Sequence, residues 1–370
     1  MTESFHCCDE LGPLKIIYIQ NLRYQLQGIL VVDNIAAGPA IGGLRMAPDV
    51  STTECARLAR AMTLKNAIAE LPHGGAKSVL IGDPKMARAE KEQLIRAFAS
   101  ALANNTEYIF GPDMGTNEEC MAWVHDEIGR AVGLPREIGG IPLDEIGATG
   151  WGVSHATEIA LQYSDINLAN ATVAFQGFGA VGSHSARYLA EQGATIVAVS
   201  DSQGTVYCKE GLDLDLLTTL KQQGGSVIDY AAGEKLSADA IIDVHCDIWV
   251  PAARPDVINS ENVDRLKARL VVQGANIPFT RDAEMTLHQR GVLVIPDFIA
   301  NAGGVICGSM EYSHLGQESA FEAIREKIRH NTGEMLKLAH AEAITPREAG
   351  ERIAIARVKR AMSLQRRPGF

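Results

Sequence analysis

The sequence predicts an α/β protein of two domains, with a doubly wound parallel sheet in its second half. Its length of 370 residues suits two domains. In the second half, short apolar runs alternate with amphipathic, helix-forming stretches, which indicates a parallel sheet with helices on both faces. A glycine-rich loop joins one apolar run to the following helix. A cluster of glycines at residues 139–152 marks the boundary between the domains.

We expect the first domain at residues 1–145 and the second at residues 146–334. Residues 320–362 form mostly amphipathic helix, interrupted near residues 345–346, and the part from about 335 to 370 is expected to return and complete the first domain. First-domain strands are expected at 16–19, 27–32 and 78–81, and helices at 52–70, 91–104 and 117–132. Second-domain strands are expected at 171–176, 195–200, 240–244, 248–250, 270–272 and 292–295, with a helix at 183–192.

Composition excludes several classes of protein. The net charge of −11 argues against binding to nucleic acid or to an anionic membrane. No apolar run reaches the roughly 18 residues of a membrane span, and residues 1–10 lack the pattern of a secretory signal. The seven cysteines are odd in number and form no C-x-x-C motif, which predicts free thiols, no zinc site and a cytoplasmic location.

The glycine-rich loop Gly177-Phe-Gly-Ala-Val-Gly182 has the spacing of a dinucleotide-binding turn. Its first glycine permits a tight turn, its second lets the backbone approach a pyrophosphate, and its third allows close packing of helix on strand. The loop therefore predicts a Rossmann-type domain, although a glycine turn in an α/β domain without nucleotide has the same pattern. The expected contacts in this loop are Gly177, Gly179, Ala180, Val181 and Gly182.

Asp201 stands at the end of the next expected strand. A carboxylate there can accept hydrogen bonds from the ribose hydroxyls and repels a 2′-phosphate. No arginine follows in Ser202-Gln203-Gly204, so NAD is favoured over NADP.

Two lysines of the first half are candidate site residues. Lys65 shares the apolar stripe of its expected helix, where it either extends its ammonium to solvent or binds an anion. Lys77 follows Gly74-Gly75-Ala76, which would let a substrate approach closely. A partly desolvated lysine near another cation can act as a base, although a charge that guards a strand end has the same pattern.

Asp113 lies in a tight turn before an expected helix, and by itself suits a helix cap as well as a catalytic carboxylate. Asn301 precedes Gly303-Gly304 in a loop that suits a ligand.

Taken together, these segments resemble the glutamate/leucine/phenylalanine/valine dehydrogenase family, from about Gly38 to Glu311. The similar segments, in order, are residues 38–46, 65–77, 112–116, 147–150, 176–201, 273–276 and 300–304. The resemblance implies reversible oxidative deamination of an L-amino acid to a 2-oxo acid and ammonia in a cleft between the domains. It also implies a nicotinamide cofactor, no metal and a homo-oligomer.

The resemblance also implies residue roles. Lys65 would hold the substrate carboxylate, Lys77 would be the general base, and Asp113 would shuttle protons. Two further groups are implied: Gly42 and Gly43 along the substrate, and Thr149, Asn276 and Asn301 at the nicotinamide.

Departures from the family pattern concern the substrate. Glutamate-specific members carry a lysine where Ile41 stands and a serine where Gly308 stands, so this chain offers no counter-ion to a second carboxylate. An apolar amino acid is therefore favoured, and the small Gly111 and Gly308 leave room for a branched or aromatic side chain.

The alternatives remain open. Residues 147–150 and the nucleotide segment resemble the glutamate branch, although Trp151 and Ala180 replace its usual arginine and asparagine. Glutamate activity with a divergent pocket is one alternative, and a non-catalytic dinucleotide-binding regulatory protein is another. A 2-hydroxy-acid dehydrogenase would need a histidine base with a carboxylate partner, and neither His155 nor His184 has an evident one in the sequence.

Overall fold

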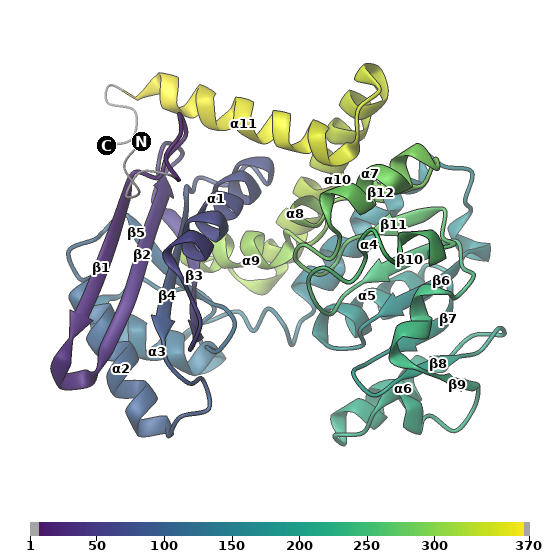
Figure 1. Ribbon diagram of the computed structural model, residues 1–370, viewed down its shortest axis with the longest axis horizontal. Helices are drawn as coiled ribbons and strands as arrows, with labels where there is room; N and C mark the ends of the chain where they lie inside the picture. Colours follow the sequence, from purple (N-terminus) through teal and green to yellow (C-terminus); the bar gives the residue numbers. More distant parts are fainter. Residues whose placement is uncertain (1–6, 366–370) are drawn as a thin grey trace. The chain divides into compact units, whose positions relative to one another are not determined.

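The computed structural model describes residues 7–365, which form two compact units (Figure 1). Unit 1 comprises the chain up to Pro142, Val305–Ala320 and the chain from Glu351 onward; unit 2 comprises Leu143–Gly304 and Phe321–Gly350. Residues 1–6, on which the absence of a secretory signal partly rests, lie outside the described part.

The C-terminal part of the chain is divided between the units differently from the prediction. We expected residues 146–334 in the second domain and residues 335–370 in the first. Residues 305–320 belong to unit 1, where the Glu311 carboxylate accepts hydrogen bonds from the backbone N–H groups of Leu134 and Ile141. Residues 321–350 belong to unit 2, where the Trp151 indole N–H donates to the Phe321 carbonyl. Such long-range contacts leave no local signal in the sequence.

Unit 1 is built on a five-stranded mixed sheet of order β1-β2-β4-β3-β5. Its strands are β1 (Lys15–Asn21), β2 (Leu26–Asn34), β3 (Ala40–Ala47), β4 (Gly75–Ile81) and β5 (Tyr108–Pro112). Strand β2 is antiparallel to β1 and β4, and β3 is parallel to β4 and β5. Strands β3 and β5 were not predicted, because glycines at 42, 43 and 111 interrupt their apolar pattern.

Helices cover both faces of this sheet. They are α1 (Thr52–Ile68), α2 (Arg88–Ala101) and α3 (Glu118–Ile128). On one face, Leu44 and Leu80 pack with Phe98 of α2 and Val124 of α3. On the other face, Val79 packs with Cys55 and Ala59 of α1. Alternate residues of a strand therefore pack either against α2 and α3 or against α1.

Unit 2 contains a seven-stranded sheet of order β12-β11-β10-β6-β7-β8-β9. Its strands are β6 (Thr172–Gln176), β7 (Thr195–Ser200), β8 (Thr205–Tyr207), β9 (Glu234–Leu236), β10 (Ile248–Pro251), β11 (Leu270–Val272) and β12 (Leu293–Ile295). The first five in spatial order are parallel, and β8 and β9 are antiparallel additions. Strand order reverses between β6 and β10, the switch point where such sheets bind ligands.

The expected strand at 240–244 is wrong. Residues Ala238–Ile242 form a 3₁₀ helix, η6, in which Ile241 and Ile242 are buried. A short apolar run is compatible with either structure, and here burial of the two isoleucines satisfies the pattern without a strand.

The remaining helices were predicted only in part, at 183–192 and within 320–362. Unit 2 contains α4 (Ala148–Leu161), α5 (Ala180–Glu191), α6 (Leu214–Gln222), α7 (Arg281–Gln289) and α8 (Asp297–Ala300). Parts of α9 (Gly303–Tyr312), α10 (Gln317–Glu342) and α11 (Pro346–Leu364) belong to each unit. The 3₁₀ helices besides η6 are η2 (Leu22–Tyr24), η3 (Arg136–Ile138), η4 (Leu168–Asn170), η5 (Val227–Asp229) and η7 (Val263–Arg265). Within residues 7–365, no helix is both long and apolar enough to cross a membrane.

Candidate active site

The candidate site of unit 1 lies on one face of the sheet, across β4, β3 and β5. In the strand register, Ile41 pairs with Gly75 of β4 and Ile109 of β5, and Gly43 pairs with Gly111. Because side chains alternate along a strand, Lys77 belongs to the same face as Gly43 and Gly111. Gly43 and Gly111 thus form a bare row, without side chains, next to Lys77.

Lys77 and Asp113 are in direct contact. The Lys77 Nζ lies 2.7 Å from Asp113 Oδ2, and the Arg45 Nε donates to the same oxygen at 3.0 Å. The Lys77 side chain is 7% exposed. Burial raises the pKa of the Asp113 carboxyl, but the Lys77 ammonium and the Arg45 guanidinium outweigh this effect and lower that pKa below its usual value. Asp113 is therefore an ionised carboxylate held between two cations.

Arg45 lies within the family-like segment 38–46, but no role was predicted for it. Its guanidinium joins Asp113 to Glu54, which accepts from Arg45 Nη1 at 2.6 Å. Arg45 stands two residues after Gly43 and therefore belongs to the same face of β3, but this relation could be used only once β3 was recognised as a strand.

The two glycines expected along the substrate differ in their surroundings. A Cβ at Gly43 would lie 2.8 Å from the Asp113 Cβ and 3.0 Å from the Lys77 Nζ, so glycine keeps this place clear. A Cβ at Gly42 would lie 1.8 Å from the Ala76 carbonyl oxygen, on the opposite face. Gly42 thus permits β3 and β4 to pair closely, whereas Gly43 clears the space above them.

The residues expected around the substrate side chain gather near one apolar cluster. Ile41, Ile109 and Val132 form the cluster, with Tyr312 packed against it. A Cβ at Gly111 would lie 3.5 Å from the Val132 Cγ2, and a Cβ at Gly308 would lie 3.4 Å from the same atom. Sequence reasoning missed Val132, since residues far apart in the chain surround it.

Lys65 lies in the last turn of α1 and is half-buried. This helix packs on the face of the sheet that carries Val79 of β4, the strand of Lys77. The role of Lys65 toward the substrate carboxylate stays a prediction.

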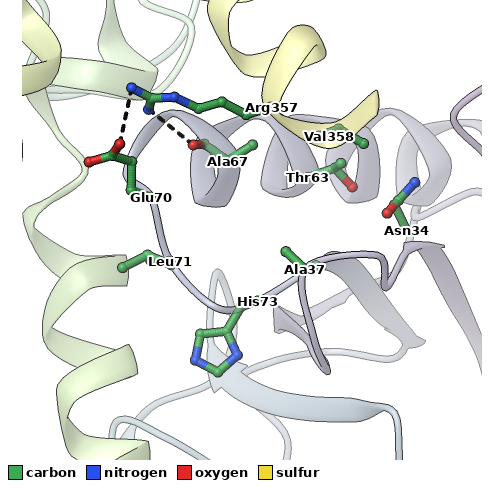
Figure 2. Close-up of a pocket in the computed structure, with 10 residues that line it drawn as sticks. Asn34, Ala37, Thr63, Ala67, Glu70, Leu71, His73, Arg357 and Val358 are labelled. Atoms are coloured by element: carbon green, nitrogen blue, oxygen red, sulfur yellow. Dashed lines mark hydrogen bonds and ion pairs between the residues drawn. The ribbon is translucent and has the colours of Figure 1, made fainter. Parts of the chain in front are cut away.

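A separate cavity of about 220 Å³ lies beside the C-terminal half of α1 (Figure 2). Its walls include Thr63 and Ala67 of α1 together with Arg357 of α11. The Arg357 guanidinium pairs with the Glu70 carboxylate at 3.3 Å. None of the predicted catalytic or substrate residues lines this cavity.

The nucleotide loop of unit 2 joins β6 to α5 and has the geometry that its glycines predict. Gly177 adopts a φ of +101°, which a tight turn requires. A Cβ at Gly179 would meet nothing within 4 Å, and a Cβ at Gly182 would lie 2.0 Å from the Gly177 carbonyl oxygen. Helix α5 begins at Ala180, so Ala180 and Val181 lie in its first turn. The open space at Gly179 and the free backbone N–H groups of this helix N-terminus fit a pyrophosphate.

Asp201 follows β7, but its carboxylate is already occupied within unit 2. It accepts hydrogen bonds from the Lys221 Nζ at 2.9 Å, the Ser226 hydroxyl at 2.8 Å and the Val227 backbone N–H at 3.0 Å. Burial raises the pKa of Asp201, but these donors outweigh it and lower that pKa to about 2. Asp201 is therefore ionised, and its negative charge is balanced by the Lys221 ammonium, which the sequence did not reveal.

The residues expected at the nicotinamide lie in unit 2. The Asn301 amide donates to the Asn276 side-chain oxygen at 2.9 Å. Thr149 lies in the first turn of α4, where its hydroxyl would be 3.4 Å from a Cβ at Gly304. The three polar side chains predicted to contact the nicotinamide thus come from segments of unit 2 that are far apart in the sequence.

His155 has a carboxylate neighbour that the sequence did not reveal. Its Nδ1 lies 3.2 Å from Glu158 Oε1, and Glu158 also pairs with Arg329. Burial and the nearby arginines lower the pKa of His155 to about 4. The His155 ring packs edge-on against the Trp151 ring, so His155 belongs to a cluster of aromatic side chains. His184 stacks on Tyr188 of the same helix, and burial lowers its pKa.

Comparison with known families agrees with this arrangement. The model of the Glutamate/Leucine/Phenylalanine/Valine dehydrogenase family matches residues 139–366, and the model of the Glu/Leu/Phe/Val dehydrogenase dimerisation domain matches residues 20–130. The chain belongs to this family of amino-acid dehydrogenases.

Individual relatives of this dehydrogenase are similar over most of their length. Glutamate dehydrogenase of Aeropyrum pernix is 38% identical over 355 residues, which cover 90% of this chain and 85% of the relative. NADP-specific glutamate dehydrogenase of Saccharolobus shibatae is 38% identical over 294 residues, or 76% and 69% of the two chains. The hetero-hexameric glutamate dehydrogenase of Thermus thermophilus superposes with a TM-score of 0.84 at 28% identity, covering 95% of this chain and 90% of that one.

Proposed function

We propose that this dehydrogenase catalyses the reversible oxidative deamination of an apolar L-amino acid, branched or aromatic, with NAD as acceptor. The observation that carries the proposal is the Lys77–Asp113 contact of 2.7 Å, beside the bare row of Gly43 and Gly111.

Three side chains of unit 1 share the chemistry. Lys65 holds the substrate carboxylate, and Lys77 takes a proton from the substrate amino group or from the attacking water. At 2.7 Å, Asp113 can exchange that proton with Lys77 directly. A bound nicotinamide would supply the hydride acceptor. In the overall balance, the amino acid and water give a 2-oxo acid and ammonia, the acceptor gains one hydride, and one proton is released.

The substrate preference rests on the residues at the far end of the site. Ile41 and Gly308 are buried beside Val132, and neither offers a cation or a hydroxyl. An unpaired carboxylate buried there would be costly. Glutamate is the alternative substrate, because the relatives named above are glutamate dehydrogenases.

A reductive-amination screen tests this proposal. We expect 4-methyl-2-oxopentanoate or phenylpyruvate to be used at least tenfold better, in kcat/KM, than 2-oxoglutarate. The double variant Ile41→Lys, Gly308→Ser should shift the ratio toward 2-oxoglutarate. Preferential use of 2-oxoglutarate by the wild type would show that the substrate assignment is wrong. Binding of NADH without turnover of any 2-oxo acid would favour a non-catalytic role.

The choice of cofactor depends on Asp201 and Lys221. The carboxylate disfavours a 2′-phosphate, but the ammonium at 2.9 Å neutralises much of that effect, so we expect a modest preference for NADH over NADPH. Lys221→Ala should increase this preference, because it leaves the carboxylate uncompensated. The exposed Lys209→Ala serves as a control that should leave the ratio unchanged. An unaltered ratio in Lys221→Ala would remove Asp201 from cofactor selection.

We also propose that the dehydrogenase is a cytoplasmic homo-oligomer. The dimerisation-domain match at residues 20–130 supports assembly, and the Thermus thermophilus relative is a hetero-hexamer, that is, an assembly of several subunits. The described cysteines are all free thiols, which suits a reducing compartment.

A further inference from the structure

One buried polar group near the candidate site has no partner. His73 is 3% exposed, and its Nε2 makes no hydrogen bond within the described protein. Buried acceptors of this kind are rare, because an unmade hydrogen bond costs free energy.

The tautomer of His73 follows from its other nitrogen. Nδ1 lies 3.1 Å from the Pro39 carbonyl oxygen, which can only accept, so Nδ1 carries the proton. Burial lowers the pKa of His73, and the ring is therefore neutral near pH 7. Nε2 is left as a lone-pair acceptor that requires an N–H or O–H donor.

The position of His73 is set by the strand register. The Ile41 backbone N–H donates to the Gly74 carbonyl, so the chain before β4 still runs beside the start of β3. His73 stands four residues before Lys77, which corresponds to roughly 13 Å along an extended chain. It therefore lies at the end of the site opposite to the reacting groups.

The ring of His73 borders the apolar cluster. It meets Tyr312 edge-on with ring centroids 5.8 Å apart, and Tyr312 packs against Ile41 and Val132. His73 also lines the cavity beside α1, and in Figure 2 its ring extends away from Thr63 and Ala67 of that helix.

We propose that His73 is a specificity-determining residue, whose Nε2 accepts a hydrogen bond from an N–H or O–H group at the far edge of an aromatic substrate side chain. This inference rests on the proposed function. The bare positions Gly43, Gly111 and Gly308 suit a flat ring, and Val132 and Ile41 supply the apolar contacts. A substrate that lacks the donor would leave the buried Nε2 unpaired. Such a loss discriminates between substrates more strongly than a difference in apolar contact does.

Paired 2-oxo acids that differ only in the donor test the inference. In wild type we expect 4-hydroxyphenylpyruvate to exceed phenylpyruvate, and indole-3-pyruvate to exceed its benzothiophene analogue, by about tenfold in kcat/KM. His73→Phe should abolish the advantage of the donor-bearing compounds while phenylpyruvate stays within about threefold. His73→Gln, which keeps an acceptor, should restore part of the advantage. The exposed His330→Phe is the matched control.

The outcomes separate the two proposals. Equal use of both members of each pair by the wild type, or equal losses for both in His73→Phe, would overturn the role of His73 and indicate that a water molecule satisfies Nε2. Turnover of aliphatic but not aromatic 2-oxo acids would also overturn it. Preference for 2-oxoglutarate would instead overturn the proposed function. If His73→Phe does not fold, the wild-type comparison still decides.

Discussion

At the scale of single residues, the proposed chemistry depends on the two cations that contact the Asp113 carboxylate. Its carboxylate contacts Lys77 and Arg45 at 2.7 and 3.0 Å and remains ionised although partly buried. The two cations differ in what they can do: a lysine can lose a proton, whereas an arginine stays charged. We therefore assign proton transfer to the Lys77–Asp113 contact and a positioning role to Arg45.

Removal of the Lys77 ammonium tests its catalytic role. Lys77→Ala should reduce kcat by at least about a thousandfold, in the range expected for loss of a general base. NADH affinity, measured by fluorescence titration, should stay within a fewfold. A variant that retained most of its rate would exclude Lys77 from the mechanism.

Arg45 should reveal itself in the pH dependence. The pKa of Asp113 is lowered in the folded protein, so its ionised form persists as the pH falls and is lost only below the usual carboxyl range. Arg45→Gln removes one of the stabilising charges, and the acid limb of the kcat/KM profile should move upward by roughly 0.5–1 pH unit. An acid limb that does not move would show that the limb reports another group.

At the scale of elements, a buried ionic network joins three segments of unit 2. Arg347, in the first turn of α11, pairs with Glu284 of α7 at 2.5 Å and with Asp297 of α8 at 2.8 Å. Asp297 in turn accepts from the backbone N–H of Ile277, the neighbour of Asn276. The network thus holds the loop that carries a predicted nicotinamide contact.

Breaking this network should destabilise unit 2. Arg347→Ala leaves two buried carboxylates without their cation, which typically costs about 3–5 kcal/mol. Denaturant unfolding measures this change in the free energy of unfolding. Arg187→Ala, which removes an exposed pair with Glu191, is the control and should cost under about 0.5 kcal/mol. Equal effects would contradict the ionic role of Arg347.

At the scale of the whole molecule, strand β1 forms an edge of the unit 1 sheet and carries exposed apolar side chains. Tyr18 of β1 is 67% exposed and Leu22 of the following turn is 83% exposed. An open edge of this kind invites pairing or covering by another chain.

Assembly through this edge can be tested directly. The variant Tyr18→Lys, Leu22→Lys should lower the molar mass measured by light scattering after size exclusion, because charge opposes burial of the edge. Tyr163→Lys, which alters a partly exposed tyrosine of unit 2, should leave the mass unchanged. An unaltered mass in the edge variant would place the interface elsewhere.

Much of the architecture was predictable because it depends on local patterns. Strand β7 and the loop at Gly177–Gly182 coincide with their predicted positions, since apolar runs and glycine spacing reflect local backbone requirements. Strands β3 and β5 escaped detection because their glycines interrupt the apolar pattern by which a strand is recognised. Residues predicted to line the site thus hid the elements that carry them.

The sequence by itself determined the α/β class, the dinucleotide turn and the candidate residues Lys77, Asp113 and Asp201. Only the tertiary structure decided that Arg45 shares Asp113 with Lys77, that Lys221 neutralises Asp201, and that Val132 and Tyr312 meet Ile41. The physical reason is that motifs record requirements of neighbouring backbone, whereas charge pairing and packing join residues whose separation along the chain carries no periodic signal.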